Sequence, residues 1–216
     1  MISNLKDILI PAQDGGYAVA CFNVFGYEDA LAVVEAAEVR NASVILSINL
    51  NMRQFMTMEQ IIGMLRPMAE KAKIPVCLHL DHTYEMDIVK QAVDSGFTSV
   101  MFDGSKQPLR MNINTTSKIA KLAQSYNVSL EGEVGIVGYH DGIVSEGTNL
   151  LEAKKFGNES GVDAMAISVG NTHLQTSKIA KIDIDKIKEI QTVTKIPLVL
   201  HGSSGISYPM RKKIAK

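Results

Sequence analysis

Several features are scarce in this sequence of 216 residues, and each scarcity excludes a class of protein. There are only two cysteines, Cys21 and Cys77, and both lie in apolar runs, which favours small core residues in a reducing compartment over a disulfide framework. The net charge is −1 and no basic block occurs, so nothing indicates nucleic-acid binding. No apolar run approaches the length of a membrane span, and the N-terminus lacks the apolar core of a signal peptide. We therefore expect a cytoplasmic protein that binds neither membranes nor nucleic acids.

The composition, with 46% hydrophobic and 21% charged residues, is that of a globular domain with a substantial core. Short apolar runs rich in β-formers alternate with longer segments of helical periodicity. The predicted strands cover residues 18–23, 43–48, 74–82, 99–103, 129–134, 164–169 and 197–201. The predicted helices cover residues 27–40, 58–73, 84–95, 113–126, 150–160 and 185–193.

Seven successive strand–helix steps predict an α/β fold with a parallel sheet. A repeat of roughly thirty residues per step is typical of a (β/α)8 TIM barrel. A doubly wound open sheet is the alternative, although no GxGxxG follows the first strand. Only residues 202–216 follow the seventh strand, so the eighth strand and the C-terminal helices have no counterpart, and two strand edges would lie open. We expect a single barrel domain over residues 1–216 that is C-terminally incomplete, as in a partial copy of a longer chain.

The third predicted strand ends in the pair Asp81-His82, at the place where parallel α/β proteins carry their chemistry. Because side chains alternate along a strand, His79 and Asp81 should share one face. His82 should then point the other way, unless the backbone at the strand's end redirects it. The simplest interpretation is that Asp81 and His82 both face a site. The alternative is that they are surface groups or hydrogen-bonded core groups.

Polar side chains also follow the other predicted strands. Catalytic zinc sites use three protein ligands, imidazoles and carboxylates among them, and keep one position open. His82, His173 and His201 each lie at the end of a different predicted strand, and finding three of the five histidines at one rim favours a metal site over unrelated loop histidines. The full set at the predicted carboxyl ends is Asn23, Asn49, Asp81, His82, Asp103, Glu131, Glu133, Asn171, His173 and His201.

The turn Gly202-Ser203-Ser204-Gly205 follows His201 directly. Small residues let backbone N–H groups approach an anion, and barrels often place a phosphate site after strands seven and eight. An ordinary glycine turn is the alternative. Beside a candidate metal ligand, the phosphate-binding interpretation is favoured.

Six motifs occur in the order found in class II fructose- and tagatose-bisphosphate aldolases, which the chain resembles over essentially its whole length. This resemblance implies a (β/α)8 barrel, a cytoplasmic homodimer or homotetramer, and a divalent metal ion, usually Zn2+. The motifs are Phe22-Asn23, His79-Leu80-Asp81-His82, residues 100–105, residues 130–135, Gly170-Asn171-Thr172-His173 and residues 200–205.

The resemblance also implies roles for individual residues. His82, His173 and His201 would bind zinc, and Asp81 would be the acid and base at the C4 hydroxyl. Asp103 and Glu133 would lie around the metal or at an alternative metal position. The residues that would contact the substrate or its phosphate are Asn23, Asn49, Gly202, Ser203 and Ser204.

These residue types suit the cleavage of a ketose 1,6-bisphosphate to dihydroxyacetone phosphate and glyceraldehyde 3-phosphate. A Zn2+ ion would spread the negative charge of the ene-diolate without a Schiff base, and no lysine ends a predicted strand. Fructose and tagatose differ in configuration at C4, and the sequence leaves both sugars open.

The sequence departs from the family pattern at four places, one of which is a link from Gly147 to Leu151 that is a few residues shorter than usual. The family's mobile loop glutamate is replaced by His140, which could act as a base because histidine titrates near neutrality; a solvated loop residue is the alternative. Leu174 stands where many relatives have Gly, which bears on a phosphate or monovalent-cation contact. The family's Asn-x-Ser/Asp-Thr-Asp/Glu motif on strand eight has no counterpart.

Two other functions remain open. One is an accessory barrel subunit that binds metal without turnover, which the missing strand and His140 favour and the intact Asp81 opposes. The other is a zinc hydrolase that uses a metal-bound water as nucleophile, which the phosphate-type turn after His201 opposes.

Overall fold

The computed structural model describes residues 1–139 and 145–215. The chain divides into two compact units. The first comprises Met1–Asp103 with Ile119–Glu131, and the second comprises Gly104–Lys118 with Gly132–Lys216. The division passes through helix α6 (Leu109–Ser125) and strand β6 (Ser129–Val134), which contribute residues to both units.

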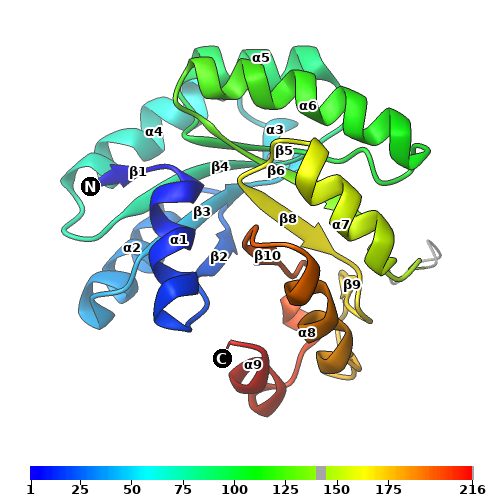
Figure 1. Cartoon of the computed structure of the whole chain (residues 1–216). Coiled ribbons are helices and arrows are strands. Elements are labelled where there is room, and N and C mark those ends of the chain that lie inside the picture. Colours follow the sequence, from blue (N-terminus) through cyan, green and yellow to red (C-terminus); the bar gives the residue numbers. More distant parts are fainter. Residues whose placement is uncertain (140–144, 216) are drawn as a thin grey trace. The chain divides into compact units, whose positions relative to one another are not determined.

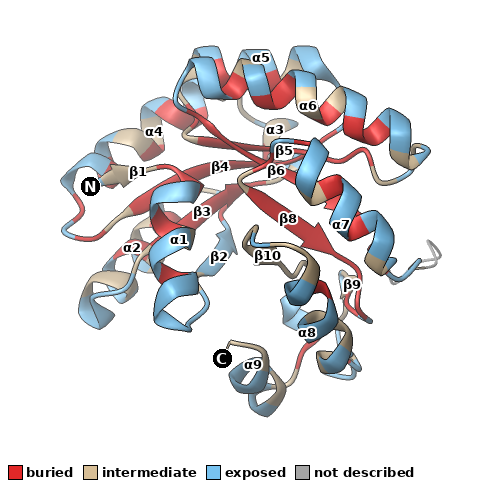
Figure 2. Cartoon of the chain, viewed as in Figure 1, coloured by how far each residue is buried: buried red, intermediate tan, exposed pale blue. Residues whose placement is uncertain are grey.

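A parallel sheet forms the centre of the first unit. Its strands β2 (Ala20–Asn23), β3 (Val44–Ile48), β4 (Val76–Thr83) and β5 (Ser99–Phe102) follow one another in the order of the sequence, with the first half of β6 beside β5. The short β1 (Ile2–Ser3) pairs with the beginning of β4. Every residue of β3, β4 and β5 is buried, as expected for a parallel sheet covered on both faces, whereas β2 is exposed (Figure 2).

Helices connect the strands of this unit (Figure 1). They are α1 (Leu5–Gly15), α2 (Tyr27–Arg40), α3 (Leu50–Arg53), α4 (Met58–Lys71) and α5 (Met86–Ser95). The sequence explains their ends: Thr57 and Gln60 form a capping box at the start of α4, and Gly96 adopts a left-handed conformation after α5. Their apolar stripes supply core residues such as Leu5, Ile61 and Val89.

The second unit is built on the buried strand β8 (Ala164–Ile167), which pairs in parallel with β10 (Leu198–Val199). A smaller parallel pair joins β7 (Gly138–Tyr139) to β9 (Thr172–His173). The helices are α7 (Leu150–Glu159), α8 (Ile184–Val193), the 3-10 turn η1 (Ser203–Gly205) and α9 (Tyr208–Ile214). Asn149 and Asp183 cap the N-termini of α7 and α8 with their side chains.

The predicted α/β fold with a parallel sheet is confirmed, and each of the seven predicted strands and six predicted helices has a counterpart. In neither unit does the strand order reverse, whereas a doubly wound sheet reverses at its switch point, so the strand order is that of the (β/α)8 barrel. The single domain and the incomplete C-terminus stay predictions. None of the helices in the described part of the chain has the length and apolar character needed to cross a membrane.

The helix α1 was not predicted. Pro11 and the pair Gly15-Gly16 interrupt the helical pattern in the sequence. The helix nevertheless forms because Leu5, Ile8 and Ala12 make one buried stripe.

Candidate functional site

An irregularity at the end of β4 brings Asp81 and His82 together. The ladder with β5 pairs Leu80 with Val100 and Thr83 with Phe102, so β4 carries one extra residue in this interval. His82 adopts a φ of +31°, which is unusual for a residue other than glycine. A bulge of this kind re-aims a side chain. It explains how two consecutive residues, which would alternate in a regular strand, can act at one place.

Hydrogen bonds fix the His82 ring and backbone. The Asp103 Oδ2 atom lies 3.2 Å from His82 Nδ1, and the His82 backbone N–H donates to Asp81 Oδ1 over 3.1 Å. His82 Nε2 is 3.8 Å from the same Asp81 oxygen. A carboxylate at Nδ1 favours a proton on that nitrogen, so the lone pair is on Nε2, where a metal ion would need it. Asp81, His82 and Asp103, predicted as site residues, are therefore neighbours within the first unit.

Arg53, which was not among the predicted site residues, supports the same stretch of backbone. Its Nη2 group donates to the carbonyl oxygen of His82 over 2.8 Å and to that of Asp81 over 3.4 Å. Burial lowers the pKa of the Arg53 guanidinium, while the negative charge of Asp81 opposes that shift. Arg53 ends α3, whose N-cap is Asn49: the Asn49 Oδ1 atom accepts the Met52 N–H over 3.2 Å. The side-chain oxygen of Asn49, predicted as a substrate contact, is thus used in capping.

His79 is a core residue of the first unit. Its Nδ1 lies 2.8 Å from the Ser99 hydroxyl oxygen, and its Nε2 lies 3.6 Å from Glu131 Oε2. His79 and Glu131 are both almost completely buried. Asn23, at the end of β2, is exposed.

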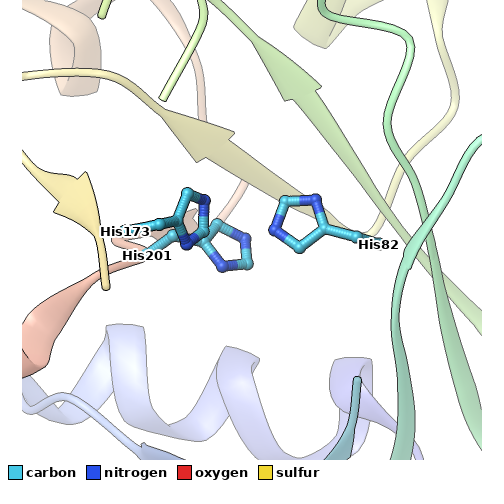
Figure 3. A group of neighbouring side chains, drawn as sticks. All are labelled: His82, His173 and His201. Atoms are coloured by element: carbon cyan, nitrogen blue, oxygen red, sulfur yellow. The ribbon is translucent and has the colours of Figure 1, made fainter. Parts of the chain in front are cut away.

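In the second unit, His173 and His201 lie side by side (Figure 3). Their ring centroids are 5.4 Å apart, and each offers a ring nitrogen within 4.8 Å of the other's. His173 belongs to β9, and His201 follows β10. Two imidazoles at one tetrahedral zinc ion have nitrogens about 3.4 Å apart, given Zn–N bonds of about 2.0–2.1 Å. The pair is therefore close enough to share an ion after a small adjustment.

Asn171 lies between β8 and β9 and was predicted only as one of the polar residues at the carboxyl ends of the strands. Its side chain is completely buried. The Asn171 Oδ1 atom accepts the Val169 N–H over 2.8 Å, and Nδ2 donates to the carbonyl oxygens of Ile167 (3.3 Å) and His201 (3.1 Å). The amide thus ties the backbone of His201 to the end of β8.

The turn predicted to bind phosphate begins at a glycine that packs closely against the backbone of β9. Gly202 adopts a φ of +69°, and a Cβ there would lie 2.2 Å from the Thr172 carbonyl oxygen, so only glycine fits. Ser203 and Ser204 are exposed and begin the turn η1. Their hydroxyls and backbone can meet a ligand from solution.

Glu133 is buried in the second unit, where its Oε1 atom accepts the Val137 N–H over 3.3 Å. The carboxylate thus holds the segment that leads from β6 to β7. His140, predicted as a base, lies outside the described residues.

The donors in each unit fit a divalent metal ion that prefers nitrogen and oxygen. The first unit offers a histidine oriented by a carboxylate, and the second offers a pair of neighbouring imidazoles. An acid, Asp81, stands beside the oriented histidine. This combination is suited to Lewis-acid and acid–base chemistry on an oxygen-rich substrate.

Comparison with known proteins identifies the class. The family model described as "Fructose-bisphosphate aldolase class-II" matches residues 3–216, and the chain belongs to this family. The resemblance recognised from the sequence motifs is therefore confirmed, and membership supports a lyase.

Individual relatives carry two different names. The chain is 39% identical to 6-phospho-5-dehydro-2-deoxy-D-gluconate aldolase of Halalkalibacterium halodurans, with 98% of this chain and 76% of the relative covered. It is 36% identical to fructose-bisphosphate aldolase of Helicobacter pylori, with 98% and 72% covered. Among solved structures, the YdjI aldolase of Escherichia coli K12 has a TM-score of 0.86 at 28% identity, covering 100% of this chain and 78% of its own. The fructose-bisphosphate aldolase of Campylobacter jejuni shares the fold, with a TM-score of 0.83 at 23% identity over 99% of this chain and 73% of its own.

Proposed function

We propose that this protein is a zinc-dependent aldolase that reversibly cleaves a ketose 1,6-bisphosphate, fructose or tagatose, to dihydroxyacetone phosphate and glyceraldehyde 3-phosphate. The observation that carries the proposal is the group at the β4 bulge, where Asp81 lies beside a histidine oriented by Asp103. Family membership and the neighbouring His173 and His201 rings support it.

A second substrate is favoured by the 39% identical relative, which is named for 6-phospho-5-dehydro-2-deoxy-D-gluconate. In both kinds of substrate a keto group lies next to a phosphate-bearing carbon. Breaking the bond between the α and β carbons of that ketone releases dihydroxyacetone phosphate in each case. The aldehyde product differs, since the gluconate derivative gives a three-carbon semialdehyde with a carboxylate.

In the proposed mechanism, His82, His173 and His201 would hold the metal ion. When bound, the ion supplies Lewis-acid stabilisation of the negative charge that develops on the keto oxygen. Asp81 accepts the proton of the hydroxyl group on the carbon that becomes the aldehyde, and returns it in the condensation direction. Asp103 keeps the His82 ring in the required tautomer.

Binding of the distant phosphate orients the reacting carbons. The Gly202–Ser204 turn is proposed to hold the phosphate next to the keto group, with Asn23 and Asn49 as further substrate contacts. His140 is proposed, from the sequence alone, as the base that exchanges the proton on the dihydroxyacetone carbon. Glu133 is proposed as a neighbour of the metal or an alternative ligand, and a monovalent cation or second divalent ion near the phosphate remains part of the proposal. The expected homodimer or homotetramer and the cytoplasmic location rest on the family likeness.

Release of dihydroxyacetone phosphate tests the proposal directly. Fructose 1,6-bisphosphate, tagatose 1,6-bisphosphate and 6-phospho-5-dehydro-2-deoxy-D-gluconate are each supplied to the zinc-loaded protein, and product is measured through NADH consumption by glycerol-3-phosphate dehydrogenase. We expect release from one of the three, loss of release with EDTA, and recovery with added Zn2+.

Two results would contradict the proposal. A zinc-loaded protein that releases nothing from any substrate would support the accessory subunit that binds metal without turnover. Release of inorganic phosphate without dihydroxyacetone phosphate would support the hydrolase.

A further inference from the structure

The backbone at Asp81 and His82 is unusual and needs support. The regular pairing of β4 is interrupted here: its register with β5 shifts between Leu80 and Thr83, and its register with β3 ends at Leu80. His82 also has a φ of +31°, a conformation that costs free energy for a side chain other than glycine. Strained backbone of this kind persists only where the surroundings hold it in place.

Arg53 provides that support through its side chain. Its Nη2 group donates to the carbonyl oxygen of His82 over 2.8 Å and to that of the preceding residue, Asp81, over 3.4 Å. The two peptide groups that flank the strained His82 Cα atom are therefore both held. Hydrogen bonds from a charged donor are stronger than neutral ones, and the planar guanidinium fixes their direction. Arg53 is itself anchored, because it ends the short helix α3, which Asn49 caps and the buried Met52 holds to the core.

We propose that Arg53 is a positioning residue for aldol cleavage: it holds the β4 bulge so that Asp81 and His82 keep their mutual geometry. This inference rests on the proposed function, in which Asp81 moves the proton and His82 binds the metal. Both hydrogen bonds of Arg53 in this stretch go to backbone carbonyl oxygens, so Arg53 acts on Asp81 and His82 by holding the backbone that carries their side chains.

The structure supplies a matched control. Arg66 also donates to a backbone carbonyl, that of Gly96 over 3.1 Å, and forms an ion pair with Glu70 at 2.9 Å. It supports the end of α5 and contacts no residue proposed for the site. Replacing either arginine by Met removes a guanidinium that donates to a backbone carbonyl oxygen. The carbonyl lies at the β4 bulge for Arg53 and at the end of α5 for Arg66.

The experiment compares Arg53→Met, Arg53→Lys and Arg66→Met with the wild type. It measures kcat and KM for the cleaved substrate, Zn2+ affinity by competition with a chelator, and the unfolding midpoint. We expect Arg53→Met to lower kcat and metal affinity about 10- to 100-fold, in the range found for residues that orient metal ligands, with KM changed less than threefold. Arg53→Lys should restore part of both, since an ammonium can reach one carbonyl. Arg66→Met should lower only the unfolding midpoint.

Chemical rescue separates positioning from a general structural effect. Arg53 lines a cavity of about 340 Å³ together with Leu50, Met56 and the exposed Glu59, so Arg53→Ala leaves space that a small cation can enter. Ethylguanidinium at millimolar concentration should raise kcat of Arg53→Ala saturably and leave Arg66→Ala unchanged. If Arg53→Met fails to fold, Arg53→Lys and the rescue of Arg53→Ala still test the positioning role.

The outcomes distinguish this inference from the proposed function. If the wild type cleaves substrate and Arg53→Met keeps kcat and metal affinity within twofold, or if rescue is absent, Arg53 has no positioning role. A wild type that binds Zn2+ but cleaves nothing overturns the proposed function, while the metal-affinity comparison still decides the effect of Arg53 on His82. A wild type that binds no metal overturns both.

Discussion

At the scale of single residues, the site depends on conformations that a regular strand does not offer. Asp81 and His82 are consecutive, yet His82 Nε2 lies 3.8 Å from Asp81 Oδ1 because β4 carries a bulge. The left-handed φ of His82 and its bond to Asp103 then determine how the ring is presented. The residue types therefore matter together with the backbone that holds them.

The role of Asp81 can be separated from metal binding by Asp81→Asn. The amide keeps an oxygen that can accept the His82 N–H, now at 3.1 Å, but it cannot take a proton. We expect kcat to fall about 10²- to 10⁴-fold, the contribution typical of a positioned acid or base, with metal content unchanged. Steady-state kinetics and metal analysis of the purified variant check this. Loss of the metal would instead identify Asp81 as a ligand.

At the scale of elements, several candidate site residues lie on very short strands or in the loops beside them. The pair β7–β9 places Tyr139 opposite His173 in register, and Asn171 joins the end of β8 to the backbone of His201. These elements are only two residues long or irregular, so they depend on side-chain hydrogen bonds more than on a ladder.

The substitution Asn171→Ala tests this dependence. It removes three hydrogen bonds and leaves buried backbone groups of Ile167, Val169 and His201 without that partner. We expect the free energy of unfolding to fall by about 2–4 kcal/mol, measured by urea denaturation in EDTA. Asn114→Ala, at an exposed position of α6 in the same unit, should change it by less than about 0.5 kcal/mol. Equal effects of the two variants would show that the Asn171 bonds contribute nothing specific.

At the scale of the whole molecule, the proposed metal ion would couple stability to metal concentration. As proposed, a single ion held by His82, His173 and His201 would bind only the folded chain, so at a free concentration 100 times Kd it would add about 2.7 kcal/mol to the free energy of unfolding. For a chain of this length, EDTA should lower the unfolding midpoint by about 5–10 °C. The same comparison with His201→Ala should show no EDTA effect. A variant that still responds to EDTA would remove His201 from the ligand set.

The fold could be predicted from the sequence because the spacing of apolar residues in strands and helices follows from which side chains are buried. The strand β6 was predicted at its observed bounds, and α2 likewise. The sequence was not sufficient for α1, where the buried stripe of Leu5, Ile8 and Ala12 overrides the effect of Pro11. Helix propensity describes an isolated segment, whereas packing against the rest of the chain determines whether that segment is helical in the folded protein.

In the candidate site, the acids and histidines could be predicted from the sequence because these side chains can bind metal ions or transfer protons wherever they occur. The sequence could not show the bulge, since an extra residue in β4 is defined only by its pairing with β5. Arg53 was missed, and Asn171 was named without a role, for a related reason: both act on backbone carbonyls, which every residue has. Which carbonyl an arginine or an amide reaches is decided by the folded structure.

The left-handed backbone at His82 also limits how the proposed metal site could be redesigned for a different ion. A softer ion would call for a thiolate at this position. Cysteine, unlike histidine, aspartate or asparagine, is not among the residues enriched at positive φ, and it would have to accept the 31° conformation before it could bind anything. Aspartate accepts that backbone more readily and would shift the preference toward harder ions. The choice of metal at this position is therefore restricted by the chain's own geometry as well as by ligand chemistry.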